Sequence, residues 1–386
     1  MELYIHIPFC VRKCAYCSFA SFPSYNRKEM ERYVCALIRE ASLRRSFLKE
    51  KVETVYIGGG TPSLLPPDLV FMLLKCLKSE MDFSSVKEFT VEANPGTVMP
   101  EWLEAILPFG ANRLSFGVQA SQDRLLNLLG RIHRFGDVVQ SVHMARQFGI
   151  KNINMDLIFG LPTQTADDWK QTLNDVLSIS PDHISAYGLI PEEGTPLFQA
   201  LENGTLSLPD PDLERNMYDC AISMLHAAGL YQYEISNFAS PGKECRHNIG
   251  YWTQVPYLGL GLSAASMIRC PDRDNQTDPF SIRWTNPSSF DGYYAMLEQD
   301  GIPEEIKETI SPEEARFETV MLSLRMTSGM HRGDFLQLHG EYPEKWYGEI
   351  LYRLKGQGLL ELRDDSWCLT RRGMDLQNSV LVEFMN

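Results

Sequence analysis

Hydrophobic and polar positions follow two different periods along the first half of the chain. Short apolar runs rich in Val, Ile, Tyr and Phe predict strands, and longer segments with apolar residues three or four positions apart predict helices. The predicted strands are residues 2–7, 52–57, 86–91, 113–118, 153–159 and 183–189. The predicted helices are residues 29–47, 67–81, 102–107, 123–129, 137–148 and 166–177. Such β-α units in a row indicate a parallel sheet with right-handed crossovers.

Polar residues and glycines gather at the carboxyl ends of these predicted strands. The second strand runs into Gly58-Gly59-Gly60, and the fifth runs into Gly160-Leu161-Pro162. Barrel-type α/β proteins build their sites at that end of the strands. Because the chain offers six β-α units and not eight, the predicted fold is α/β, an open, partial (β/α)6 barrel.

The pattern changes after residue 200. Residues 212–228 predict a long helix, and residues 231–237 predict a strand. An aromatic stretch through Trp252 and a run of small residues at 259–265 follow. This region is expected to extend the barrel.

The last segment, residues 304–386, predicts a separate small α+β unit. It begins with a helix at 312–325 and continues with two more helices, a hairpin that turns at Asp364-Asp365 and a terminal helix. This order of elements resembles a winged-helix domain. The predicted parts of the chain are therefore residues 1–200, 201–303 and 304–386.

Composition and charge narrow the range of partners. Of the 386 residues, 44% are hydrophobic and 22% are charged, which suits a globular core. The formal net charge of −14 argues against a nucleic-acid partner. The sequence has no apolar run long enough to span a membrane and no basic region before an apolar stretch at its start. We therefore expect a cytoplasmic protein, with peripheral membrane contact left open.

Three of the nine cysteines lie close together, at Cys10, Cys14 and Cys17, with the spacing C-x3-C-x2-C. The other six are scattered and do not form the dense pattern of a secreted disulfide framework. Three thiolates are one ligand short of closing a four-iron cluster, so one iron stays open to another ligand. The alternatives are a redox pair and a zinc site, for which His6 is the available fourth ligand.

Strand ends further along the chain supply groups that suit a small polar ligand. The glycines of Gly58-Gly59-Gly60 let backbone approach a ligand closely. Glu92 and Asp156 offer carboxylates for hydroxyl groups, and Arg131 suits a carboxylate in a bidentate contact. Salt bridges and helix caps at a barrel rim are the alternative for each of these side chains.

These motifs resemble the coproporphyrinogen-oxidase branch of the radical-SAM proteins. The likeness is carried by residues 90–95 (TVEANP), 113–119 (RLSFGVQ) and 154–162 (NMDLIFGLP), and it extends from Tyr4 to about Arg325. It implies a [4Fe–4S] cluster on the three clustered cysteines, with S-adenosylmethionine (SAM) at the open iron. The SAM contacts that it implies are Tyr4, Tyr16, Gly59, Gly60, Thr61, Glu92, Gln119, Arg131 and Asp156.

Two related families share this resemblance, the oxygen-independent coproporphyrinogen III oxidases and the HemW-type haem chaperones. The oxidases carry a fourth cysteine two positions after the third, where this chain has Phe19 after Ser18. They also carry a long extension before the cluster, whereas the first predicted strand here starts near residue 3. Residues 247–252, His-Asn-Ile-Gly-Tyr-Trp, match the chaperone motif H-N-x-x-Y-W. The resemblance therefore favours the chaperones.

The H-N-x-x-Y-W motif implies a haem site. A neutral imidazole such as that of His247 is a natural axial ligand of haem iron, and Tyr251 and Trp252 could stack on the macrocycle. A buried, hydrogen-bonded His247 before an aromatic core strand is the alternative, and Cys245 is a rival thiolate ligand.

The expected function is that of a chaperone, which binds haem and delivers it to an acceptor haem protein, with a respiratory protein as one candidate. No catalytic residue is assigned, and the electron donor is not identified; a homodimer stays open. One alternative is a coproporphyrinogen III oxidase, which converts propionates to vinyl groups by radical oxidative decarboxylation. The other is a radical-SAM enzyme that acts on haem itself.

Overall fold

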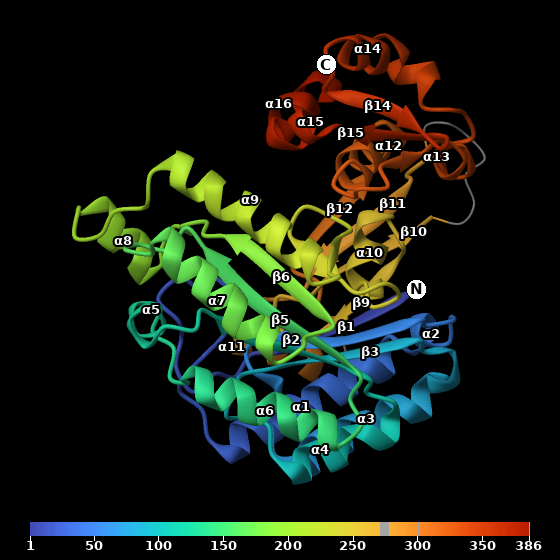
Figure 1. Cartoon of the computed structure of the whole chain (residues 1–386). Helices are drawn as coiled ribbons and strands as arrows, with labels where there is room; N and C mark the ends of the chain where they lie inside the picture. The colour runs from blue at the N-terminus through green and yellow to red at the C-terminus, as the bar shows by residue number, and fades with distance from the viewer. Residues whose placement is uncertain (271–277, 300, 386) are drawn as a thin grey trace.

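A curved parallel sheet forms the centre of the molecule, which a computed structural model describes for residues 1–270, 278–299 and 301–385. The six predicted β-α strands are neighbours in chain order, and each pairs in parallel with the next (Figure 1). They are β1 (Glu2–Ile7), β2 (Thr54–Gly59), β3 (Glu88–Ala93), β4 (Arg113–Gln119), β5 (Asn152–Phe159) and β6 (His183–Gly188). The prediction of a parallel, partial α/β barrel is confirmed.

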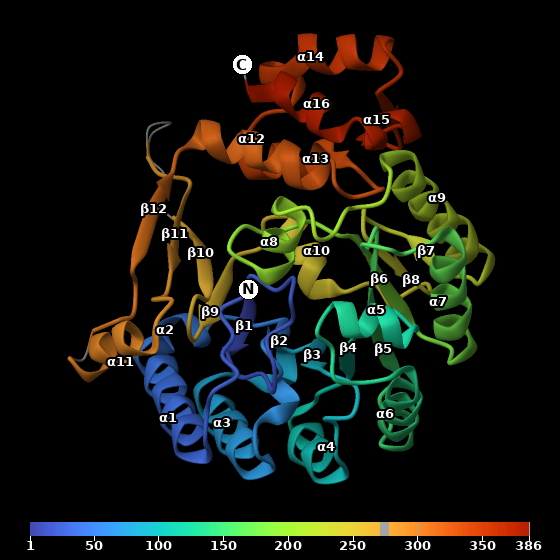
Figure 2. The same cartoon turned by 90° about the vertical axis from the view of Figure 1, so that its left-hand side faces the viewer.

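Helices cover the convex face of this sheet, as Figure 2 shows. They are α1 (Arg27–Leu43), α2 (Arg45–Leu48), α3 (Pro67–Glu80), α4 (Pro100–Ile106), α6 (Phe135–Gln147), α7 (Ala166–Ser178) and α9 (Pro211–Ala227). The short helices α5 (Asp123–Leu128) and α8 (Pro196–Glu202) lie between them in the chain. Capping boxes start α1 at Asn26 and α7 at Thr165, where each side chain accepts a backbone N–H of the first turn.

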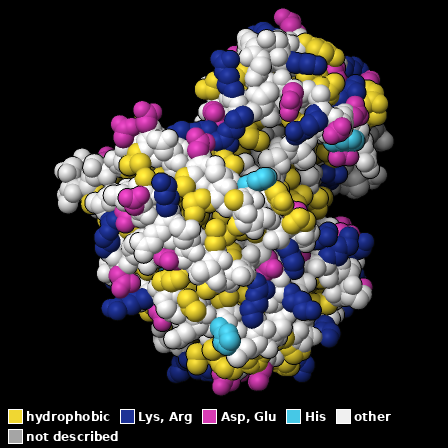
Figure 3. Space-filling view, in the orientation of Figure 1, with side chains coloured by type: hydrophobic (Ala, Val, Ile, Leu, Met, Phe, Trp, Pro, Cys, Tyr) yellow, Lys and Arg dark blue, Asp and Glu magenta, His cyan; other side chains and the backbone are white. Residues whose placement is uncertain are grey.

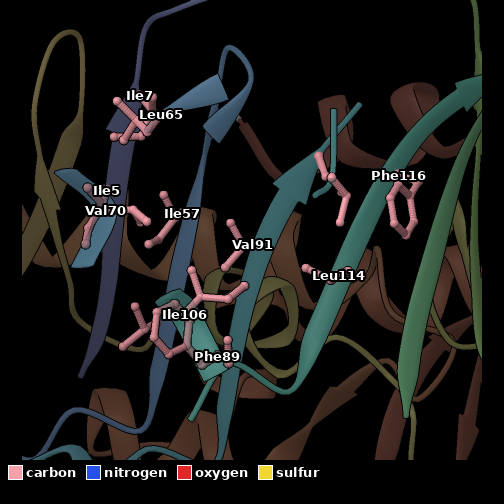
Figure 4. Close-up of a cluster of buried hydrophobic side chains, with 14 of the residues drawn as sticks. Ile5, Ile7, Ile57, Leu65, Val70, Phe89, Val91, Ile106, Leu114 and Phe116 are labelled. Carbon is pink, nitrogen blue, oxygen red and sulfur yellow. The ribbon is translucent and has the colours of Figure 1, made fainter. Parts of the chain in front are cut away.

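Alternation along the strands separates the core from the concave face. Ile5, Ile57, Val91 and Leu114 point toward the helices and pack with side chains such as Ile106 of α4 (Figure 4). Successive side chains of a strand point to opposite faces, so the residues between them face the concave side of the barrel. The polar and aromatic residues described below come from that side.

The sheet is longer than the predicted barrel, because further strands continue it at both edges. On the β1 side, β9 (Tyr257–Leu260) pairs in parallel, and β10 (Ala265–Arg269), β11 (Ser281–Thr285) and β12 (Ile306–Ile310) follow antiparallel. On the β6 side lie β8 (Asn237–Ala239) and β7 (Tyr231–Gln232). The large sheet therefore has the order β12-β11-β10-β9-β1-β2-β3-β4-β5-β6-β8-β7.

The prediction of one strand at residues 231–237 is wrong. The chain turns between β7 and β8 around the buried carboxylate of Glu234, which accepts hydrogen bonds from the backbone of Ser236 and the amide of Asn237. Arg325 donates to the same carboxylate at 2.6 Å. The buried Glu234 carboxylate accepts hydrogen bonds from residues of the same turn, and the strand therefore ends after Gln232.

The C-terminal unit lies across the open side of the barrel (Figure 2). Its elements are α12 (Pro312–Ser323), β13 (Met330–His331), α13 (Arg332–His339), α14 (Glu344–Gly356), β14 (Leu360–Arg363), β15 (Ser366–Leu369), α15 (Arg371–Asp375) and α16 (Gln377–Val382). The predicted hairpin is confirmed, since β14 and β15 pair antiparallel and Asp364 and Asp365 both have positive φ. Because β12 pairs within the large sheet, α12 is the first element of this unit, and the division at residue 304 stays a prediction.

Two surface features bear on partners. On the face shown in Figure 3, acidic and basic side chains are interspersed among the described residues, without one sign dominating. Within the described part of the chain, no helix combines the length and the apolar character needed to cross a bilayer.

Candidate functional site

A cavity of about 140 Å³ opens at the carboxyl ends of the parallel strands. It brings together most of the residues that the sequence predicts for the cluster and for SAM. Those in its wall are Cys10, Cys14, Tyr16, Cys17, Gly59, Gly60, Glu92, Gln119, Arg131 and Asp156. The remaining two, Tyr4 and Thr61, lie outside this wall. The hydroxyl of Thr61 is directly behind it, 3.7 Å from Sγ of Cys10.

The three cysteines lie in the loop that follows β1. Backbone bonds hold this loop to the barrel, because Cys10 N–H donates to Phe22 and Ala15 N–H donates to Leu129. Nη1 of Arg131 lies 3.5 Å from Sγ of Cys14, so a cation stands beside the thiols. Burial raises the pKa of the Cys10 thiol. Thiols that lie around a cavity beside a guanidinium suit an anionic iron–sulfur cluster.

The zinc alternative depends on His6 as a fourth ligand beside the three cysteines. His6 uses both ring nitrogens elsewhere, with Nδ1 at 3.0 Å from the Tyr4 hydroxyl and Nε2 at 2.8 Å from the Ala20 carbonyl oxygen. His6 therefore holds the base of the cysteine loop and offers no fourth ligand.

The glycine turn after β2 has no room for side chains. A Cβ on Gly59 would lie 2.3 Å from the His6 ring, and its φ of +105° is one that side chains disfavour. A Cβ on Gly60 would lie 2.7 Å from the carbonyl oxygen of Phe9. The turn thus packs against the cysteine loop and exposes backbone to the cavity.

Two half-buried carboxylates, Glu92 and Asp156, face the cavity from β3 and β5. Glu92 accepts hydrogen bonds from the Tyr56 hydroxyl at 2.8 Å and from Gly59 N–H at 3.0 Å. Desolvation raises the pKa of Glu92 to about 7. Asp156 accepts from the Ser115 hydroxyl at 3.0 Å, and burial also raises its pKa. These hydrogen bonds hold both carboxylates in place at the cavity.

Sequence reasoning missed one link in the wall, Asn94. Its carbonyl oxygen accepts from Nη2 of Arg131 at 2.5 Å, and its amide donates to the Thr61 hydroxyl at 2.7 Å. Asn94 therefore joins the glycine turn to the arginine. Its place directly after β3, beside Glu92, was the available signal.

Gln119 reaches the cavity through an irregularity in β4. The register with β5 shifts between Gly117 and Gln119, and Gln119 has a φ of +68°. A bulge of this kind redirects a side chain at the end of a strand. The strained backbone is typical of functional sites.

His247 lies at the opposite end of the barrel, on helix α10 (Arg246–Trp252). Its Nδ1 is 2.8 Å from the hydroxyl of Thr54, the first residue of β2, and its backbone N–H donates to Glu88, the first residue of β3. Its Nε2 is 2.9 Å from the Tyr251 hydroxyl. The side chain is 1% exposed, and burial lowers the pKa of His247 to about 3. Both imidazole nitrogens are thus in hydrogen bonds, and burial favours the neutral ring.

Cys245 is a weak rival for haem iron. Its Sγ lies 3.5 Å from a carboxylate oxygen of Glu88, and burial raises the pKa of the thiol to about 12. Metal ligation requires the thiolate, which this environment disfavours.

Aromatic rings link the two ends of the barrel. The Tyr56 hydroxyl donates to Glu92 at the cavity, and the Tyr56 ring stacks on His247 with centroids 5.0 Å apart. Tyr4 stacks on Tyr56 at 6.2 Å and faces a second cavity of about 490 Å³. Tyr56 therefore contacts both Glu92 and His247.

Comparisons with known proteins agree with this geometry. The model of the radical SAM superfamily matches residues 4–176, and that of the HemN C-terminal domain matches residues 310–376. Heme chaperone HemW of Bacillus subtilis is 35% identical over 389 residues, which cover 99% of this chain and 98% of that protein. Heme chaperone HemW of Synechocystis sp. is 38% identical over 335 residues, which cover 85% of this chain and 78% of that protein.

One solved structure resembles the whole chain. It is coproporphyrinogen III oxidase (HemN) from Escherichia coli, a radical SAM enzyme, which superposes with a TM-score of 0.83 and covers 99% of this chain and 89% of its own. At 23% identity, this likeness shows the fold.

Proposed function

The chain belongs to the HemW family of radical-SAM proteins, and we propose that it binds haem and delivers it to an acceptor haem protein. The proposal rests on the H-N-x-x-Y-W helix α10, which places His247, Tyr251 and Trp252 together at the amino end of the barrel. It is supported by the similarity to HemW proteins along nearly the full chain.

The residues at the carboxyl end of the strands fit a [4Fe–4S] cluster and SAM. Cys10, Cys14 and Cys17 would hold the cluster, and the wall with Glu92 and Arg131 would hold SAM. When bound, the cluster supplies an open iron for the amino and carboxylate groups of SAM, and one electron. The protein's part would be to orient SAM, with Glu92 and the glycine turn available for its amine and Asp156 available for its ribose hydroxyls.

Binding of haem at His247 requires a local rearrangement. The imidazole is already neutral, as iron ligation demands. Its Nε2 becomes available only when the Tyr251 hydroxyl moves away. This requirement links haem binding to the position of one aromatic side chain.

The proposal places the protein in the cytoplasm. All nine cysteines are free thiols, which suits a reducing compartment. The proposed partners are haem, an acceptor haem protein and an electron donor. A homodimer and peripheral membrane contact are further possibilities of this proposal.

The affinity for SAM is expected to fall as the pH is lowered through about 7. The pKa of Glu92 in the free protein is raised to about 7, and a cationic ligand favours the ionised carboxylate. Below that pH a proton must leave Glu92 before SAM binds, whereas above it the affinity levels off. Equilibrium binding of SAM from pH 6 to pH 8.5 measures this dependence. Glu92→Gln should bind SAM more weakly and lose the step near pH 7, and an unchanged step in that variant would exclude Glu92 as its source.

Haem binding is expected to be saturable near one haem per chain and to be lost or strongly weakened in His247→Ala. The change removes the proposed ligand and also the bonds to Thr54 and Tyr251 that hold α10. Absorbance titration of the anaerobically reconstituted protein measures the affinity. His143→Ala is the control, since His143 is exposed on α6.

Three other results would contradict the proposal. Haem binding that is absent, or indifferent to His247, would count against the chaperone. Conversion of coproporphyrinogen III to protoporphyrinogen IX with SAM and a reductant would favour the oxidase. Breakdown or methylation of haem under the same conditions would favour an enzyme that acts on haem.

A further inference from the structure

Two cavities flank helix α10, one on each side of the H-N-x-x-Y-W segment. The first has a volume of about 320 Å³, and Ile249, Gly250 and Thr253 are among the residues that line it. The second has a volume of about 490 Å³, and Tyr251 and Trp252 are among the residues that line it. We call the first the polar basin and the second the α10–α12 cavity. Both volumes are in the range of small-molecule sites, so the chemistry of the walls decides between them.

Five of the twelve residues that line the polar basin have ionisable side chains, of both signs. They are Glu2, Glu53, Lys87, Glu244 and Arg246, and burial raises the pKa of Glu2 to about 9. Covering these charges with a flat apolar ring would cost their hydration without replacing it. The basin is therefore a poor site for a porphyrin.

The α10–α12 cavity has an aromatic and sulfur-rich wall. It is formed by residues of β1, β9, β10, β11, α10 and α12 and of the turns before and after β9. The rings and thioethers in this wall are Tyr4, Tyr251, Trp252, Tyr257, Met267 and Met321. Aromatic faces stack on flat π-systems, and a methionine sulfur is one of the axial ligands that proteins give haem iron.

One charged pair offers polar contacts at this cavity. Nη2 of Arg283 donates to both carboxylate oxygens of Glu318 at 2.9 Å, and the Arg283 side chain is 32% exposed. A propionate could compete with Glu318 for the guanidinium in the same geometry.

We propose that the α10–α12 cavity is the site of the haem macrocycle, held between the barrel extension and helix α12 of the C-terminal unit. This inference rests on the proposed function and says where in the molecule the haem binds. Tyr251 stands between this site and His247, because its ring lines the cavity and its hydroxyl bonds Nε2 of His247. Haem in the cavity therefore meets Tyr251 first and reaches His247 through its displacement.

The role of the C-terminal unit follows from the same placement. Met321, Leu322 and Glu318 of α12 close the cavity against the sheet. Since α12 is the first helix of that unit, the C-terminal unit supplies part of the wall of the proposed haem site.

The test fills each cavity with a large side chain in the full-length, reconstituted protein. Ala265→Trp on β10 fills the α10–α12 cavity, and Thr253→Trp fills the polar basin on the other side of α10. We expect Ala265→Trp to bind haem about tenfold more weakly or worse, because overpacking opposes the ligand. Thr253→Trp should bind as the wild type does. Iron content and far-UV circular dichroism show whether each variant keeps its cluster and fold.

A second variant keeps the test decisive if Ala265→Trp fails to fold. Met321→Trp fills the same cavity from α12 and should also weaken haem binding. If the wild type binds haem and a folded cavity variant binds equally well, the site is overturned while the chaperone function stands. Weakening in Thr253→Trp alone would move haem to the polar basin. Failure of the wild type to bind haem would overturn the proposed function itself.

Discussion

Replacing Cys10, Cys14 and Cys17 together by alanine is expected to remove all cluster iron and to abolish SAM binding at the cluster. The three thiols line one cavity at the carboxyl ends of the strands, and no other cysteine is in its wall. The amino and carboxylate groups of SAM lose their iron when the cluster is absent. Iron and acid-labile sulfide per chain, together with the cluster absorbance, measure the loss.

The fold should survive this triple change. The three cysteines are partly exposed in a surface loop, so their removal leaves no large void in the core. Cys35→Ala is the matched control, because Cys35 is exposed on α1 and away from the cavity. Iron at the wild-type level in the triple variant would exclude this loop as the cluster site.

The central strands could be predicted closely because they are buried on both faces. Strand β1 was expected at residues 2–7 and is Glu2–Ile7, and the strand expected at 153–159 is Asn152–Phe159. Parallel strands under helices are nearly continuous apolar runs, which are easy to find. Strand β12, in contrast, has four exposed residues of five, so its sequence carries little hydrophobic pattern.

The residues of the candidate sites also differ in how far they could be predicted, because some depend on local sequence features and others on contacts with distant parts of the chain. The cysteine spacing, the glycine turn and the strand-end carboxylates are local features, and the structure brings them to one cavity. The burial of His247 depends on Thr54 and Glu88, which are 193 and 159 residues away in the chain. Such long-range partners cannot be predicted from one sequence. The motif indicated the residues for haem and gave no sign that its histidine lies at the barrel's other end.

Glu40→Ala is expected to destabilise the protein by about 3–5 kcal/mol, the cost of breaking a buried, hydrogen-bonded ion pair. Glu40 is fully buried on α1 and accepts from Gly261 N–H, the Asn286 amide and the Tyr293 hydroxyl, each at 2.7 Å. It also pairs with the buried Arg44 at 3.3 Å. Alanine would leave these donors without an acceptor and Arg44 with Glu304, also at 3.3 Å, as its remaining counter-charge. Urea or thermal unfolding of the intact protein measures the loss.

Two further variants separate burial from helix propensity. Glu31→Ala changes an exposed acid on the same helix and should leave the free energy of unfolding almost unchanged. Glu40→Gln keeps an acceptor for the turn at Gly261 but removes the charge, so it should lie between Glu40→Ala and the wild type. Because these bonds join α1 to the turn after β9 and to α11 (Phe290–Glu298), the loss would loosen the barrel extension that walls the α10–α12 cavity. Equal stability of Glu40→Ala and Glu31→Ala would show that this buried network does not hold the extension in place.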